Sequence, residues 1–152
     1  MERQNRKRLY LDICTLCRPF DDQSLMRIRL ETDAYYLILQ ALQDARYALV
    51  VSPVHFAEAN AISDVEERRE VLAVLETLGT TAECDMAATR ARAEDLSSRK
   101  FGIADGAHVA FAEATADFFI SCDDRLVRKC RREKVTVTAI NPIEFTIAED
   151  LK

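Results

Sequence analysis

Four acidic side chains occupy positions where a parallel sheet would bring them together. Asp12 closes a short apolar run and Asp123 follows another, while Glu58 and Asp105 lie early in predicted helices. Carboxylates that share a crevice repel one another, so their pKa values rise unless a cation lies between them. An all-oxygen ligand set suits a hard divalent ion, Mg²⁺ or Mn²⁺. The sequence therefore indicates a metal site that could activate water and stabilise a leaving oxygen, as phosphodiester hydrolysis requires.

Each acid also has a simpler explanation when it is taken alone. Asp105 could favour a helix N-terminus, Glu58 could be a solvated helix residue, and Asp123 or Asp124 could cap the helix that follows. Asp12 has no such role, because the end of a strand needs no cap. The four acids together favour a metal site. Within it Asp123 is the predicted ligand rather than Asp124, because it continues directly from the strand end.

A basic segment follows Asp123 directly. Residues 125–134 carry six basic side chains against the single acid Glu133, a local charge of +5. A charged helix is often only a solvated face, but its place beside the acidic group favours contact with phosphates. Further basic residues near the N-terminus could extend this surface. The candidate substrate-binding residues are Ser121, Arg125, Arg128 and Lys129.

The histidines and cysteines give weaker signals. His108 lies on the same helical face as Asp105, and a packing or partner-contact role is favoured over metal ligation. His55 is predicted to lie on the surface of a short helix. Cys14 and Cys17 form a CxxC without a second pair at zinc-site spacing, so they and the other three cysteines are predicted to be free thiols.

Short apolar runs alternate with helical patterns along the chain. The runs follow the order β-α-β-α-α-α-α-β-α-β, which is typical of a mostly parallel sheet covered on both faces by helices. In such sheets ligands bind at the carboxyl ends of the strands, where the four acids are expected. The predicted strands are 9–12, 47–51, 118–121 and 135–138. The predicted helices are 24–45, one starting at Ser52-Pro53, one from a Ser63-x-x-Glu66 capping box to Gly79, 85–98, 104–115 and 124–133.

Composition bounds the class of protein. The 152 residues are 49% hydrophobic and 31% charged, with a formal net charge of −5. These values are typical of one globular domain, and they argue against a disordered chain or a dedicated duplex-binding module. We expect a single domain over 1–152, with residues 1–8 forming a flexible basic tail. No signal-peptide pattern or apolar run of about 20 residues is present, which predicts a cytoplasmic protein without membrane contact.

Four sequence blocks together resemble a PIN domain, the fold of the VapC-type toxin ribonucleases. They are LYLDICTL at 9–16, SPVHFAE at 52–58, IADGAHVA at 103–110 and FISCDDRL at 119–126. The resemblance spans about residues 9–140. It implies an α/β fold, a three-layer α/β/α sandwich around a mostly parallel central sheet. It also implies a Mg²⁺- or Mn²⁺-dependent endoribonuclease that hydrolyses single-stranded RNA, the toxin-like member of a pair with an antitoxin protein.

The resemblance places catalytic and metal-binding roles on Asp12, Glu58, Asp105 and Asp123, the acids already singled out. Two positions depart from the pattern of the family. Cys14 stands where a small polar residue is usual, and this substitution could alter how Asp12 is positioned. Ser121 stands where Thr is commoner. Helix 24–45 has more apolar surface than one face needs, which includes Tyr35 and Tyr36. Core packing is the default explanation, and a contact with a second copy, which adds a homodimer to the expected partners, is the alternative.

Two alternatives remain open at this stage. One is a catalytically silent PIN-like module that binds RNA or protein, although such a module has no need for four mutually repelling acids. The other is a Mg²⁺-dependent phosphatase or phosphoacceptor domain. A domain of that class is expected to have a second Asp two residues after Asp12 and a well-placed Lys, and neither is found in the sequence.

Overall fold

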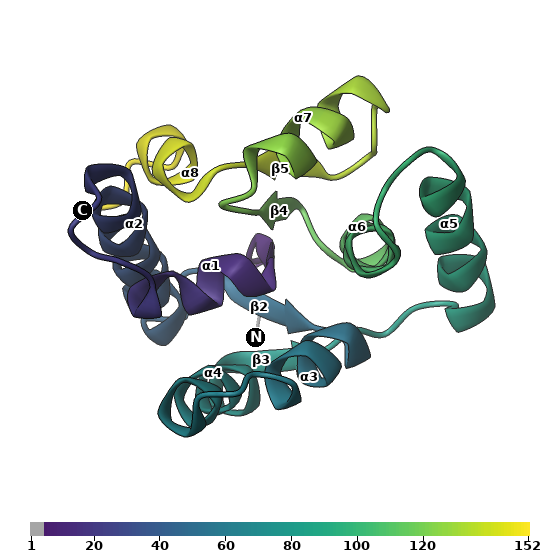
Figure 1. Cartoon of the computed structure of the whole chain (residues 1–152). Helices are drawn as coiled ribbons and strands as arrows, with labels where there is room; N and C mark the ends of the chain where they lie inside the picture. Colours follow the sequence, from purple (N-terminus) through teal and green to yellow (C-terminus); the bar gives the residue numbers. More distant parts are fainter. Residues whose placement is uncertain (1–4) are drawn as a thin grey trace.

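Five parallel strands form one sheet in the order β3-β2-β1-β4-β5 (Figure 1). The computed structural model describes residues 5–152, and throughout that range every strand pairing is parallel. The strands are β1 (Arg8–Leu11), β2 (Ala48–Val51), β3 (Gly79–Thr81), β4 (Phe118–Ile120) and β5 (Thr138–Ile140).

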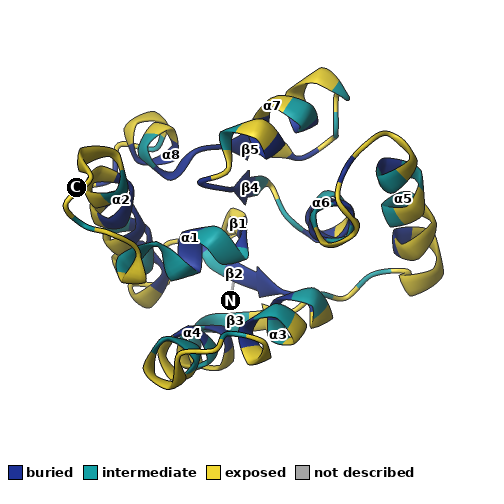
Figure 2. Ribbon diagram, viewed as in Figure 1, coloured by how far each residue is buried: buried dark blue, intermediate teal, exposed yellow. Residues whose placement is uncertain are grey.

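Helices cover both faces of this sheet, which gives a three-layer α/β/α sandwich (Figures 1 and 2). One face is packed by α1, α2, α4 and α8, and the other by α5, α6 and α7. The predicted α/β fold is therefore confirmed. The helices are α1 (Ile13–Cys17), the 3-10 turn η1 (Arg18–Phe20), α2 (Met26–Gln43), α3 (Pro53–Asn60), α4 (Val65–Leu78), α5 (Met86–Ser98), α6 (Ile103–Thr115), α7 (Asp124–Arg132) and α8 (Pro142–Ala148).

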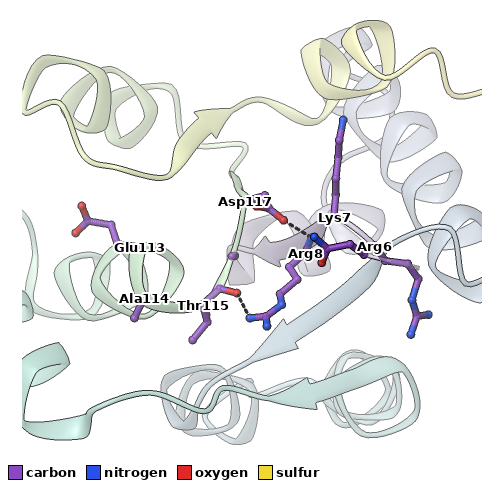
Figure 3. A pocket seen from close by; sticks show the side chains of 9 residues that line it. Arg6, Lys7, Arg8, Glu113, Ala114, Thr115 and Asp117 are labelled. Atoms are coloured by element: carbon purple, nitrogen blue, oxygen red, sulfur yellow. Dashed lines mark hydrogen bonds between the residues drawn. The ribbon is translucent and has the colours of Figure 1, made fainter. Parts of the chain in front are cut away.

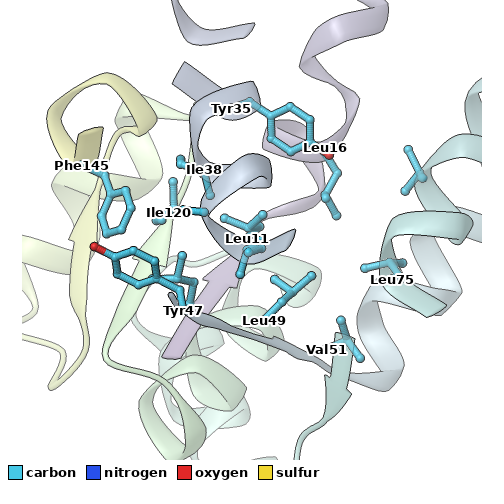
Figure 4. Packing of buried hydrophobic residues seen from close by; sticks show 14 of the residues in the cluster. Leu11, Leu16, Tyr35, Ile38, Tyr47, Leu49, Val51, Leu75, Ile120 and Phe145 are labelled. Carbon is cyan, nitrogen blue, oxygen red and sulfur yellow. The ribbon is translucent and has the colours of Figure 1, made fainter. Parts of the chain in front are cut away.

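Alternation along the strands divides the core between the two faces. Leu9 and Leu11 of β1 belong to the cluster under α1, α2, α4 and α8, whereas Tyr10 belongs to the cluster under α5, α6 and α7. Figure 4 shows Leu11 in the first cluster, together with Ile38 of α2 and Leu75 of α4. Burying an apolar side chain of this size stabilises the fold by about 1.5–3 kcal/mol. Both layers of helices are thus held by the same central strand.

The central strand β1 is also the point where the order of the strands reverses. The chain proceeds from β1 to β2 and β3 on one side, and later places β4 and β5 on the other. Asp12, Ser52, Ser121 and Asn141 directly follow the carboxyl ends of β1, β2, β4 and β5 respectively. Crevices at such switch points are the usual ligand sites of open α/β sheets.

The last strand is displaced from its predicted position at 135–138. Lys134 has a φ of 52°, a turn conformation that carries the chain around the end of α7. Val135 and Val137 then pack against the second core cluster as loop residues. Pairing with β4 begins only at Thr138, opposite Phe118. Two apolar residues at strand-like spacing thus predicted a strand three residues too early.

The start of α4 also differs from the prediction. Asp64, rather than Ser63, is the N-cap, and its carboxylate accepts a hydrogen bond from the Glu67 backbone N–H at 2.9 Å. The helix ends at Gly79 as predicted, but Gly79 has extended backbone and opens β3. A Cβ there would lie 2.3 Å from the Leu75 carbonyl oxygen, so only glycine fits. Strand β3 and helices α1 and α8 were not predicted.

Candidate active site

The Asp12 carboxylate is buried at the carboxyl end of β1. It stands at the N-cap position of α1 but makes no side-chain cap bond there. Its Oδ2 instead accepts hydrogen bonds from Ser121 Oγ at 2.7 Å and from the Cys14 thiol at 3.2 Å. The Asp12 N–H donates to the Ile120 carbonyl at 2.9 Å, which extends the pairing of β1 with β4. The junction of these two strands therefore fixes Asp12.

Ser121 links Asp12 to Asp123. The Ser121 side chain is wholly buried, and its Oγ accepts a hydrogen bond from the Asp123 backbone N–H at 3.0 Å. Because the Ser121 hydroxyl also donates a hydrogen bond to the Asp12 carboxylate, this side chain sets the spacing between Asp12 and the backbone of Asp123. This arrangement favours a positioning role for Ser121, and its contact with a substrate stays a prediction.

Cys14 takes part in holding Asp12 despite its departure from the family pattern. Contact with the Cys122 thiol, burial and the nearby Asp12 charge all raise the pKa of Cys14. The thiol is therefore protonated at neutral pH and can donate to Asp12, although a thiol is a weak donor. All five cysteines are free, as predicted.

Asp123 and Asp124 occupy different environments. The exposed Asp123 caps α7, and its Oδ1 accepts hydrogen bonds from the backbone N–H groups of Arg125 and Leu126 at 3.0 and 3.2 Å. Asp124 begins the helix and pairs with Arg27 of α2 at 2.6 Å. This hydrogen-bonded ion pair lowers the pKa of Asp124. Asp124 is thus engaged with α2, while Asp123 remains linked to Ser121 and Asp12.

Glu58 and His108 meet across α3 and α6. The Glu58 carboxylate is about a third exposed, and its Oε1 is bonded to Nε2 of the wholly buried His108. His55 is likewise buried, so its predicted surface position is wrong. Its Nε2–H donates to the Leu11 carbonyl at 2.6 Å, and its Nδ1 accepts from the Ser52 N–H at 3.0 Å. Burial, assisted by the neighbouring His108, lowers the pKa of His55 to about 3.

The charges of the other three acidic side chains affect the pKa of Asp105. It lies in the first turn of α6, half-buried. Burial raises its pKa, and the charges of Asp12, Asp123 and Glu58 raise it further, against a smaller opposing effect of His108. The charges of the other three predicted acids therefore act on Asp105. Within residues 5–152, no three side chains of the His, Cys, Asp or Glu type already form a group that could hold a metal ion.

Three of the four predicted substrate-binding residues, Arg125, Arg128 and Lys129, lie along α7. Arg125 and Arg128 are exposed. The Lys129 Nζ donates to the Lys100 carbonyl at 2.8 Å and lies 5.9 Å from the centre of the Phe101 ring. Lys129 is thus held against the loop before α6, whereas the two arginines are free to reach solvent. Their role in binding RNA stays a prediction.

The basic residues of the N-terminal segment lie at the opposite end of the sheet. Residues 1–4 of the predicted tail are outside the described residues. Arg6, Lys7 and Arg8 line a hollow of about 370 Å³ beside the amino ends of β1 and β4 (Figure 3). Arg8 already belongs to β1, and Lys7 pairs with Glu149 at 2.9 Å. A flexible tail over all of 1–8 is therefore wrong for these two residues, and this hollow is separate from the acidic site.

The sequence patterns did not reveal a buried carboxylate in α2. Glu31 of α2 is wholly buried and accepts hydrogen bonds from Arg18 at 2.9 Å and from Asn141 at 2.6 Å. It joins the end of β5 to η1 and α2. Its helical spacing from the buried residues Tyr35 and Ile38 was the signal that could have revealed it.

Comparison with known proteins confirms the architecture. No protein-family model and no curated protein matches the sequence. The crystal structure of FitAcB from Neisseria gonorrhoeae matches with a TM-score of 0.52 at 17% sequence identity, over 88% of this chain and 97% of that chain. At this level of identity the match establishes the fold, which is the PIN-like sandwich that the sequence blocks implied.

Proposed function

We propose that this chain, which has the PIN-like fold, is a Mg²⁺- or Mn²⁺-dependent endoribonuclease that cleaves single-stranded RNA. One observation carries the proposal: the buried Asp12 carboxylate stands at the carboxyl end of the central strand, where the strand order reverses and Ser121 joins it to the position of Asp123. Burial and the charges of Asp12, Asp123 and Glu58 also raise the pKa of Asp105. A divalent cation would relieve this repulsion, and oxygen ligands are those that Mg²⁺ and Mn²⁺ prefer.

In this proposal Asp12, Asp105 and Asp123 hold the metal, and Glu58 completes the site or orients the attacking water. A bound divalent ion supplies Lewis acidity and lowers the pKa of water. The contribution of the chain is to orient the Asp12 carboxylate through hydrogen bonds from Ser121 and Cys14.

Exposed guanidinium groups of α7 are proposed to contact the RNA backbone. Arg125 and Arg128 follow Asp123 by two and five residues and are exposed, as phosphate-binding residues must be. An antitoxin and a second copy of the chain are the proposed protein partners. Of the two tyrosines that suggested a homodimer, Tyr35 is in the core and Tyr36 is 52% exposed, so Tyr36 alone is available for such a contact. No helix in the described part of the chain has the length and apolarity to cross a membrane.

Two rival functions are less well supported. A silent PIN-like binding module would gain nothing from a carboxylate whose pKa is raised by three others. A phosphatase or phosphoacceptor domain would place a second acid two residues after Asp12, where the structure has the Cys14 thiol bonded to Asp12.

The proposal predicts metal-dependent cleavage of RNA. Purified protein should cut single-stranded RNA in the presence of Mg²⁺ or Mn²⁺, and EDTA should abolish the cleavage. The measurement is the appearance of fragments from a panel of labelled RNAs, with Asp12→Asn as the control for a contaminating nuclease. Cleavage that survives complete chelation would show that the metal mechanism is wrong, and an intact RNA panel with metal present would favour the silent module.

A further inference from the structure

A continuous chain of buried hydrogen bonds leads from the end of β2 to Glu58. Ser52 Oγ and the Tyr10 hydroxyl lie 2.7 Å apart, and the Tyr10 hydroxyl lies 2.6 Å from His108 Nδ1. His108 Nε2 is then bonded to Glu58. Ser52, Tyr10 and His108 are each at most 1% exposed, and only Glu58 reaches solvent.

The donors and acceptors of these hydrogen bonds can be assigned for an ionised Glu58 and an uncharged His108 ring. An ionised carboxylate only accepts, so His108 Nε2–H donates to Glu58. If the His108 ring is uncharged, its Nδ1 accepts, so the Tyr10 hydroxyl donates to Nδ1 and itself accepts from Ser52. Each hydrogen bond thus has a defined donor and acceptor, and all of them run in one direction, from Ser52 through Tyr10 and His108 to Glu58.

The far end of this chain is fixed by a second histidine. His55 bonds to the Ser52 N–H and to the Leu11 carbonyl, at the ends of β2 and β1. Its ring lies 4.4 Å from that of Tyr10, measured between centroids. His55 therefore fixes the backbone of Ser52 and packs against the Tyr10 ring, and β1, which Asp12 directly follows, is part of the same framework.

We propose that His108, aligned by Tyr10 and Ser52, is a positioning residue that holds the Glu58 carboxylate in one orientation beside the other three acids. The inference rests on the proposed function and extends it to three buried residues that do not touch the substrate. Partners of this kind around a ligand carboxylate or imidazole typically contribute about 10–100-fold to activity or metal affinity.

The first test removes a single oxygen. Tyr10→Phe should lower kcat by about tenfold and leave KM for RNA unchanged, because Glu58 loses its orientation while the RNA-binding surface is intact. Tyr47→Phe is the matched control: its hydroxyl bonds to Glu149 at 2.9 Å, away from the acidic site, and kcat should not change. An unchanged kcat in Tyr10→Phe, or an equal loss in both variants, would overturn the proposal.

A double-mutant cycle separates positioning from a structural role. In the Glu58→Gln background, Tyr10→Phe should cause no further loss, because the residue through which it acts has lost its charge. A purely structural role predicts the same loss in both backgrounds. His108→Gln, which retains a donor, should also keep more activity than His108→Leu. Equal losses in these two variants would contradict a donor role for His108.

A readout without RNA distinguishes this inference from the proposed function. Nitrogen chemical shifts of His108 should show the Nε2-protonated tautomer in wild type, with that preference weakened in Tyr10→Phe. Stabilisation of the fold by Mn²⁺ should also fall in Tyr10→Phe. If wild type cleaves no RNA but these shifts occur, the nuclease proposal fails and the positioning proposal stands. If the tautomer and the Mn²⁺ response are unchanged, the positioning proposal fails.

Discussion

Asp123→Asn is expected to lower metal-dependent RNA cleavage by about a hundredfold or more, equivalent to about 2.7 kcal/mol in the activation free energy. Asp124→Asn should change the rate by less than about twofold, because a surface ion pair contributes only about 0–1 kcal/mol to the fold. The difference arises because Asp123 is linked to Asp12 through Ser121, whereas Asp124 is paired with Arg27. The measurement is the initial cleavage rate of both variants at saturating Mn²⁺.

The substitution by asparagine isolates the charge of Asp123. Asparagine caps a helix about as well as aspartate, so the hydrogen bonds to the first turn of α7 should persist. Equal thermal stability of Asp123→Asn and wild type in EDTA is the control for this assumption. A large loss of activity in Asp124→Asn with Asp123→Asn unaffected would show that Asp124 is the ligand.

Asp105→Asn is expected to stabilise the metal-free protein at pH 7. Burial and three neighbouring charges raise the pKa of Asp105, so its ionised form destabilises the folded state. If Asp105 only favoured the N-terminus of α6, loss of its charge would instead cost about 0.3–1 kcal/mol. Thermal melts of both proteins in EDTA measure the sign of the difference.

The effect of pH on this difference has a defined sign. Below the ordinary value of 3.8 Asp105 is protonated in both the folded and unfolded states, and its charge contributes nothing. As pH rises through the window between 3.8 and the raised folded pKa, the unfolded state releases its proton first, so wild type loses stability. The advantage of Asp105→Asn should therefore appear above pH 3.8 and be complete once the pH exceeds the raised pKa of the folded state.

Metal should reverse the order of stability. Mn²⁺ at about 100 times its Kd stabilises a protein by about 2.7 kcal/mol by mass action, and it should stabilise Asp105→Asn much less than wild type. A variant that is destabilised in EDTA and responds to Mn²⁺ as strongly as wild type would remove Asp105 from the site. The metal would then have to be bound by Asp12, Asp123 and a group other than Asp105.

The elements that hold the site were predictable because their patterns are local. The last three residues of β1 and the residues of β2 and β4 are apolar and mostly buried between the two helix layers of a parallel sheet, so they form continuous runs. Strand β3 escaped prediction because it is a polar edge strand, and only its first residue is partly buried. Helix α8 begins with Asn141-Pro142, the same kind of cap and first-turn proline as Ser52-Pro53, and that signal was overlooked.

The acids were predictable, and the groups that hold them were not. Asp12 and Asp123 come at the ends of apolar runs, and this pattern can be read directly from the sequence. Tyr10 resembles an ordinary core residue of a strand, and only the three-dimensional structure places its hydroxyl beside His108. His55 was assigned to the surface because polar residues in short helices usually lie there, whereas the ends of β1 and β2 provide both of its hydrogen-bond partners.

The most direct test of the central claim is a crystal structure of the wild-type protein soaked in Mn²⁺, with an anomalous-difference map. We expect a manganese peak at the carboxyl ends of β1 and β4, in contact with Asp12, Asp105 and Asp123 and weakened in crystals of Asp105→Asn. A peak elsewhere on the molecule, or a map without a peak among these carboxylates at saturating Mn²⁺, would contradict the account.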